Sequence, residues 1–228
     1  MKMQKNNVIY FPDKIQEELF GILDEIFNFA VHRFNHTITE KTEELIKDIN
    51  VSDELSERIF PQLVWWVIFC SPSAQDKPSI YQQFLHKNKH RWQEKSLAIQ
   101  EILVSWLSLN PGFHYVEDTN SESGRVFIFR DIFEDEIKIV GIYNKTFQAP
   151  QEGELIIGLL LPMGKGIYTT QGGLFHIPEP YTQKIVREVI PYYQKHSISP
   201  NYHLNPQLFP SMIKLALEKV ERRMPNGS

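Results

Sequence analysis

The stretch LVWWVIFC, residues 63–70, is a run of eight apolar residues in a chain that otherwise mixes apolar with polar residues. It is too short to cross a membrane, because a spanning helix needs about 20 apolar residues. Pro61 stands just before it and suits the first turn of a helix. We predict a buried helical segment with Trp65 and Trp66 in the core. In the alternative interpretation, one indole faces a groove and anchors a ligand or partner.

The sequence around this run has the apolar spacing of helices. Asp13 and Gln16 form a capping-box pattern, and apolar residues follow at intervals of three and four. A second, separate helix is predicted over residues 39–49. The helical spacing continues to NPG at 110–112, where proline and glycine interrupt it. We therefore predict a helical region over residues 1–112.

Residues 113–178 have a different pattern, with short β-rich runs separated by turns. The runs follow one another at intervals of about 8–12 residues, which is typical of a small antiparallel barrel or rolled sheet. Helical spacing then returns, in one helix ending near Pro191 and another beginning near Pro210. The predicted fold class is α+β: a helical N-terminal region, a small antiparallel β barrel or rolled sheet, and two C-terminal helices (179–228) that pack on the rest.

The composition restricts the classes of function. The chain has 24 basic and 28 acidic residues and a net charge of −4, so it lacks the basic excess typical of proteins that bind nucleic-acid backbones. Its one cysteine, Cys70, can form neither an internal disulfide nor a thiolate metal cage. The first residues lack the apolar core of a signal peptide, and no apolar run is long enough for a membrane span. We expect a cytoplasmic protein without a cofactor or a membrane partner.

The segment WWVIFCSPSAQDKPSIYQQFL, residues 65–85, resembles bacterial proteins of the SEC-C class. In those proteins, a tryptophan-rich stretch precedes a polar loop and a short helix that opens with Ser or Thr and closes in Phe-Leu. Residues 113–178 are similar to the small β module of the same proteins. The cysteine-rich zinc motif that names the class is missing here, so the resemblance implies an accessory region of unassigned role and no zinc function. The β-module positions that carry the likeness are Tyr115, Val116, Asp131 to Phe133, Glu134 to Glu136, Gly153 to Ile156, Pro162 and Tyr168.

Two histidine pairs are candidates for a metal site. His32 with His36, and His86 with His90, are spaced so that each pair would share one face of a helix. Neither pair has the glutamate of the zinc-protease motif. The sequence HKNKHR that contains the second pair is also typical of a solvated basic face.

A second candidate is the set Asp118, Glu136 and Lys138. Its spacing resembles that of metal-dependent nucleases, in which two carboxylates hold Mg²⁺ and a lysine stabilises developing charge. Glu136, however, belongs to FEDE, a turn pattern that places it in solvent. Cys70 has no identifiable base, and no nucleophile elbow is present. A metal-dependent hydrolase or nuclease using this set or the histidine pairs is the alternative function.

The run GRVFIFR, residues 124–130, alternates arginine with phenylalanine. On a small barrel, such residues can stack on bases and contact phosphates, although the same alternation makes an ordinary half-buried strand. Because no catalytic pattern outweighs its structural alternative, the predicted function is a non-enzymatic binding or adaptor protein of a bacterial cytoplasm. Its expected partner, bound through the β module, is a protein, with a short single-stranded nucleic acid as the alternative. The candidate partner-binding residues are Trp65, Trp66, Tyr115, Arg125, Phe127 and Arg130.

Overall fold

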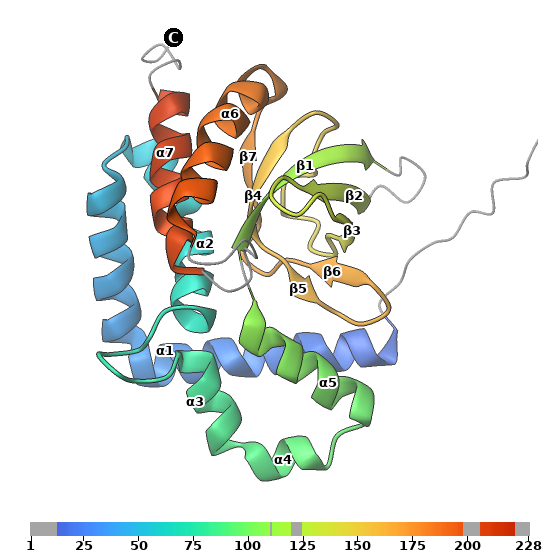
Figure 1. Ribbon diagram of the computed structural model, residues 1–228. Helices are drawn as coiled ribbons and strands as arrows, with labels where there is room; N and C mark the ends of the chain where they lie inside the picture. Colours follow the sequence, from blue (N-terminus) through green and yellow to red (C-terminus); the bar gives the residue numbers. More distant parts are fainter. Residues whose placement is uncertain (1–12, 110, 120–124, 198–205, 222–228) are drawn as a thin grey trace, which may run out of the picture.

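The computed structural model describes residues 13–109, 111–119, 125–197 and 206–221. It confirms the predicted α+β class, with long N-terminal helices, a curled sheet and two C-terminal helices (Figure 1). The helices are α1 (Lys14–Ile49), α2 (Asp53–Phe69), α3 (Ile80–Lys87), α4 (Lys89–Gln93), α5 (Leu97–Ser105), η1 (Trp106–Ser108), α6 (Glu179–His196), η3 (Pro206–Leu208) and α7 (Phe209–Glu221). The strands are β1 (Pro111–Thr119), β2 (Val126–Asp131), β3 (Ile137–Gly141), β4 (Leu155–Leu159), β5 (Leu161–Pro162), β6 (Ile167–Thr169) and β7 (Phe175–Ile177). Within the described ranges, no helix is both long and apolar enough to span a membrane.

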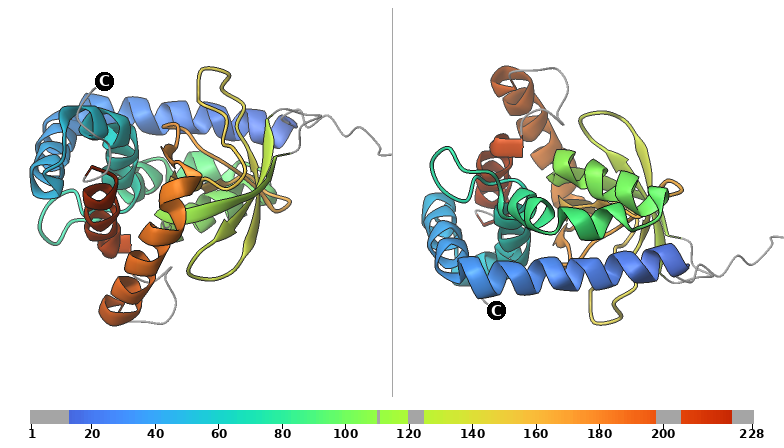
Figure 2. Two further views of the ribbon diagram at one scale, coloured as in Figure 1. Left: turned by 90° about the horizontal axis from the view of Figure 1, so that it is seen from above. Right: turned by 90° about the horizontal axis from the view of Figure 1, so that it is seen from below.

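Helix α1 begins at the predicted capping box. The Asp13 carboxylate accepts the backbone N–H groups of Ile15 and Gln16, and the Gln16 side chain accepts the Asp13 N–H. The helix runs across the width of the molecule (Figure 2) and leaves helical geometry once, at Phe34 (φ −129°, ψ 17°). Its second half then takes a different direction beside α2 (Figure 1). The helix predicted over residues 39–49 is present as this second half, but it begins at the kink at Phe34, without a loop between the two helical halves.

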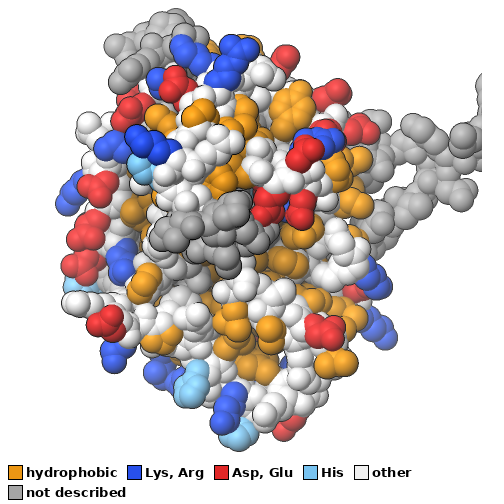
Figure 3. Space-filling view, viewed as in Figure 1, with side chains coloured by type: hydrophobic (Ala, Val, Ile, Leu, Met, Phe, Trp, Pro, Cys, Tyr) orange, Lys and Arg blue, Asp and Glu red, His pale blue; other side chains and the backbone are white. Residues whose placement is uncertain are grey.

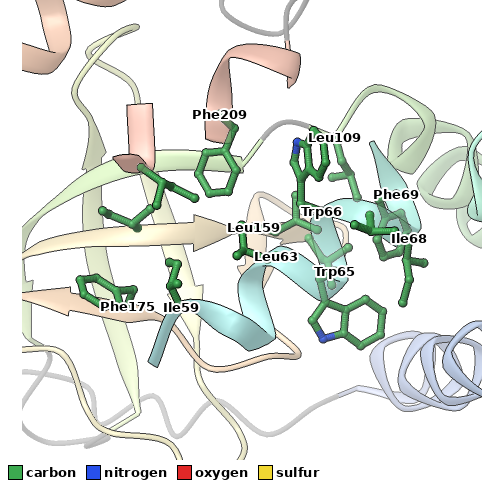
Figure 4. Packing of buried hydrophobic residues seen from close by; sticks show 14 of the residues in the cluster. Ile59, Leu63, Trp65, Trp66, Ile68, Phe69, Leu109, Leu159, Phe175 and Phe209 are labelled. Atoms are coloured by element: carbon green, nitrogen blue, oxygen red, sulfur yellow. The ribbon is translucent and has the colours of Figure 1, made fainter. Parts of the chain in front are cut away.

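Helix α2 carries the apolar run 63–70 and lies at the centre of the core, as predicted. It packs against α1, α3 and α7, and against strands β4 and β7. Figure 4 shows Leu63 and Trp66 of α2 among Leu159 of the sheet and Phe209 of α7, all of them buried. Burying a side chain of this kind contributes about 1.5–3 kcal/mol, so this run explains much of the packing between helices and sheet.

Two prolines lie inside helices at positions where the sequence predicted helix boundaries. Pro61 falls in the middle of α2, which begins at Asp53, and α6 continues past Pro191 to His196. A proline inside a helix removes one backbone hydrogen bond. Both helices bury an apolar face, and that packing outweighs the lost bond. The boundaries predicted at Pro61 and Pro191 are therefore wrong.

The seven strands form one curled sheet in the order β5-β6-β3-β2-β1-β4-β7. Neighbouring strands are antiparallel except for β3 and β6, which run parallel because the chain passes through β4 and β5 before it returns to the edge of β3. The predicted rolled sheet is thus present, but it is a mixed sheet with one parallel strand pair and not a purely antiparallel one. The register of β1 against β2 shifts between Val116 and Asp118, which marks a β-bulge.

The two faces of the sheet contact different surroundings. One face, which carries Phe113, Leu155 and Phe175, packs on the helices in the main core. The other face, named here the distal face, turns away from these helices. It carries a second apolar cluster made of Val116, Phe127, Phe129, Val140, Ile142, Ile156 and Leu160.

Candidate binding groove between α1 and α2

A hollow of about 500 Å³ opens between the first half of α1 and the middle of α2. We call it the α1–α2 groove. Helical spacing aligns its α2 residues on one face, α1 contributes Asp24 and Phe27, and the loops that follow β3 and β6 contribute the remaining residues. The apolar lining residues are Phe27, Phe60, Pro61, Val64, Trp65 and Phe147, and the polar or small ones are Asp24, Gln171 and Gly172.

Trp65 is the largest side chain in the lining of the groove. Only 8% of it is exposed, and its ring centroid lies 5.7 Å from that of Phe27 and 5.8 Å from that of Phe69. Gly172 lies against its pyrrole edge, so closely that a Cβ at this position would be 2.6 Å from the indole Cδ1. Within the described residues, the indole Nε1 forms no hydrogen bond. The groove therefore offers an aromatic wall and one unused N–H donor.

Trp66 leaves a different side of α2, because successive helical residues point about 100° apart. Figure 4 shows the two indoles leaving the helix in different directions. Trp66 is 6% exposed and packs in the main core. Both tryptophans are thus buried as predicted, but Trp65 also lines a groove, as the alternative interpretation has it.

A second hollow, of about 330 Å³, shares Phe60 with the groove and continues along α2 toward its first turn. Two of its lining residues are the acids Asp53 and Glu57. Together with Asp24 of the groove, they place three carboxylates around the apolar surface. Among the described residues, no lysine, arginine or histidine lines either hollow.

The other predicted binding residues do not line the groove. Phe127 is 3% exposed on the distal face, so it has no free surface for a partner. The Arg125 guanidinium donates to the backbone carbonyls of Ile142 and Asn144. Tyr115 is half-buried and lies opposite Arg130 in the β1–β2 ladder.

Arg130 is occupied by neighbouring acids. Its guanidinium pairs with the carboxylates of Glu117 and Asp135. The hydrogen bonds that the guanidinium donates to these two carboxylates raise the pKa of Arg130 above its usual range. The sequence suggested Arg130 as a phosphate-binding residue, but these two carboxylates already neutralise its positive charge. On the face shown in Figure 3, basic and acidic side chains are interspersed, without a continuous basic stripe.

The histidine pairs do not lie on regular helices. The kink at Phe34 separates His32 from His36 in α1, and the break between α3 and α4 separates His86 from His90. All four side chains are exposed. In the part of the chain that the structure describes, no group of three or more His, Cys, Asp or Glu side chains is placed to hold a metal ion.

Lys138 has a partner that the sequence did not indicate. Its Nζ lies 2.9 Å from Oδ2 of Asp131, on the distal face, where both side chains are buried. Asp118, in contrast, is exposed and pairs with Ile128 near the other end of β2, while Glu136 is exposed beside the β2–β3 turn. The structure therefore does not bring the nuclease-like set together.

His114 completes this buried cluster. Its Nδ1 is 3.7 Å from Oδ2 of Asp131, and within the described residues neither ring nitrogen has a hydrogen-bond partner. Burial lowers the pKa of His114 to about 3, so the imidazole is neutral at pH 7. This cluster was not identified from the sequence. Its signal is the alternation of side chains along β1 and β2, which places His114 and Asp131 on the same face as apolar residues.

Asp131 has a structural role in the β2–β3 turn. Burial opposes its ionisation, but the neighbouring charges and the N–H of Phe133 outweigh burial and hold its pKa below the usual range. Its Oδ1 accepts the backbone N–H groups of Phe133 and Glu134, at 2.9 and 3.3 Å. This carboxylate thus fixes the turn and compensates the buried charge of Lys138.

Two further groups carry reactive side chains, one of them buried on the distal face and the other, Cys70, half-buried at the end of α2. Glu154 and His176 form a second buried contact on the distal face, with Oε2 and Nδ1 2.9 Å apart. Burial raises the pKa of the Cys70 thiol to about 12, so this cysteine is an inert packing residue.

Comparison with models of known protein families, with curated proteins and with solved structures gives no match to this chain. The resemblance to SEC-C proteins stays a prediction.

Proposed function

We propose that this chain is a non-enzymatic binding protein whose α1–α2 groove holds an apolar segment of a protein partner. The observation that carries the proposal is Trp65, an indole in the wall of an open groove with an unused N–H donor. Aromatic side chains in such positions dominate the energy of many protein interfaces, because they offer large area and lose little rotamer entropy. A backbone carbonyl of the partner is a suitable acceptor for the indole N–H.

The surroundings of the groove support a protein partner over a small molecule. Phe27 and Phe60 are 42% and 43% exposed, and Val31 continues the apolar surface one turn along α1. An apolar surface that extends beyond the hollow suits a polypeptide, which covers the hollow and its rim together.

The same surroundings favour a protein over a nucleic acid. The three carboxylates around the apolar surface would repel phosphates, and Arg130 already pairs with Glu117 and Asp135. In the described part of the chain, no comparable geometry supports a metal-dependent hydrolase. A bacterial cytoplasm is proposed as the location, on the strength of the single cysteine and the SEC-C resemblance.

Site-specific photo-crosslinking tests this proposal. Benzoylphenylalanine is placed at position 60 in one sample and, as a matched control, at position 104, because Val104 is an exposed apolar residue of α5 outside the groove. We expect a discrete protein adduct from position 60 that survives nuclease, is absent from position 104, and is lost when Phe27→Ser is added. Equal labelling from both positions, labelling that nuclease removes, or no adduct from position 60 would contradict the proposal.

A further inference from the structure

The distribution of charge around the groove indicates the chemistry of the partner. On the basis of the proposed function, we infer that the groove recognises a cationic amphipathic segment, in which lysine or arginine flanks the apolar side chains. The groove and the hollow beside it are lined by Asp24, Asp53 and Glu57 and, among the described residues, by no basic side chain.

The three carboxylates are not paired with other side chains of the described residues, and Asp53 lies in the first turn of α2, where a negative charge favours the helix. None of them forms an ion pair or a side-chain hydrogen bond with any described residue. The next residue along α1 behaves differently, since the Glu25 carboxylate holds Arg91 with two hydrogen bonds of 2.6 and 2.7 Å. Within the described residues, the three carboxylates of the two hollows, unlike that of Glu25, remain available to a partner.

Helix α2 arranges acidic and apolar residues in one line. Asp53, Glu57, Phe60 and Val64 follow at intervals of four, three and four, which places them on one helix face. The acidic end lies in the first two turns of α2 and the apolar end in the groove. A helical rise of 1.5 Å per residue puts Asp53 about 10 Å from Phe60 along the axis.

Asp24 lies on the other wall of the groove, on the same face of α1 as Phe27. Negative charge therefore stands on both sides of the aromatic wall. A segment that inserts apolar side chains between Phe27, Phe60 and Trp65 would bring its flanking side chains next to these carboxylates. Lysine or arginine at those places gains attraction, while aspartate or glutamate is repelled.

Fluorescence anisotropy with labelled peptides tests the inference on the full chain. The probe is a short helical peptide made of lysine, leucine and phenylalanine, and the comparison peptides carry glutamine or glutamate in place of every lysine. We expect the lysine peptide to bind about tenfold more tightly than the glutamine peptide, with the difference falling as salt rises. Equal affinity of the lysine and glutamine peptides would overturn the inference.

Matched protein variants locate the effect. Asp53→Asn with Glu57→Gln should weaken the lysine peptide about three- to tenfold and leave the glutamine peptide unchanged. Glu94→Gln with Glu152→Gln makes the same change of net charge at exposed sites outside both hollows, and it should have no effect. Equal weakening by both pairs would show general attraction to an acidic protein and would overturn the inference.

The Phe60→Ser variant separates the inference from the proposed function. If the peptides bind with equal affinity but Phe60→Ser abolishes their binding, the groove is a binding site and only the preference for cations is wrong. If Phe60→Ser leaves binding unchanged, or no peptide binds, the proposed function fails as well. Circular dichroism of each variant confirms that the fold is retained.

Discussion

The α1–α2 groove and the distal face of the sheet differ in whether their polar groups are available to a partner molecule. The distal face holds the side chains with the richest chemistry, His114, Asp131 and Lys138, but it encloses all three. The groove and the hollow beside it hold an indole N–H without a hydrogen-bond partner and carboxylates without a side-chain partner within the described residues. Burial thus limits His114, Asp131 and Lys138 to a structural role, and the binding that we propose falls to the aromatic and acidic surface around α2.

The largest effect is expected from Asp131→Ala. The change leaves the charge of Lys138 buried without compensation and removes the acceptor of two backbone N–H groups. Breaking a buried ion pair in this way costs about 3–5 kcal/mol of the free energy of unfolding, measured by denaturant titration at pH 7. The control is Glu136→Gln, an exposed acid five residues away, with a change below about 0.5 kcal/mol. A small effect of Asp131→Ala would show that the distal face does not carry stability.

A pH-dependent effect is expected from His114. The unfolded chain binds a proton on this imidazole near pH 6.5, but the folded chain does so only near pH 3. Protons therefore favour the unfolded chain between these values, and lowering the pH from 7 to 5 costs about 2 kcal/mol from this group. Asp131 and Lys138 are the charged groups that face it.

Denaturant titrations at pH 7 and pH 5 measure this loss. The His114→Phe variant should remove it, since phenylalanine can keep the stacking on Phe129 and has no proton to gain. His86→Gln, at an exposed position, should leave the loss unchanged. A pH dependence that survives His114→Phe would show that the buried imidazole is not its source.

A smaller effect is expected from Gly172→Ala in the groove. The new Cβ would be 2.6 Å from Cδ1 of Trp65 and 3.2 Å from the carbonyl oxygen of Pro61, so the indole must move. We expect a loss of about 1–2 kcal/mol, with a shift in tryptophan emission. Gly21→Ala, a helical position with open space around it, should stabilise the protein by about 0.5–1 kcal/mol. Unchanged stability and emission in Gly172→Ala would contradict the close packing on Trp65.

The smallest effect on stability is expected from Phe60→Ser. Because 43% of this side chain is exposed, the free energy of unfolding should fall by at most about 1 kcal/mol, while binding of the lysine peptide should be lost. Denaturant titration and anisotropy on the same preparation measure both quantities. Asp131→Ala should show the reverse, with lower stability and unchanged peptide affinity while the protein remains folded. If each variant lost both stability and peptide affinity, the groove and the distal face would not have separate roles.

The sequence predicted the local elements better than the surfaces they form. The apolar run 63–70 and the capping box at Asp13 are local features, and both predictions are confirmed. The bend at Phe34 and the continuation of the helix past Pro61 were missed, because tertiary packing outweighs local preference there.

The site residues were harder to predict. Trp65 was identified as a residue that could face a groove, but the other wall comes from Asp24 and Phe27, and Gly172 comes from a loop more than a hundred residues away. Such contacts leave no periodic signal in one sequence. Lys138 was noticed, but its partner is set by strand register, which no local pattern reveals.

The most direct test of binding in the groove is the ¹⁵N spectrum of the tryptophan indoles as the lysine peptide is added. The chain has four tryptophans, and Trp106 is an internal control because its buried indole donates to the carbonyl of Pro162 at 2.8 Å. We predict that the Trp65 resonance, assigned with Trp65→Phe, moves downfield and saturates, while that of Trp106 stays in place. A Trp65 resonance that does not move when anisotropy shows saturation would contradict the account.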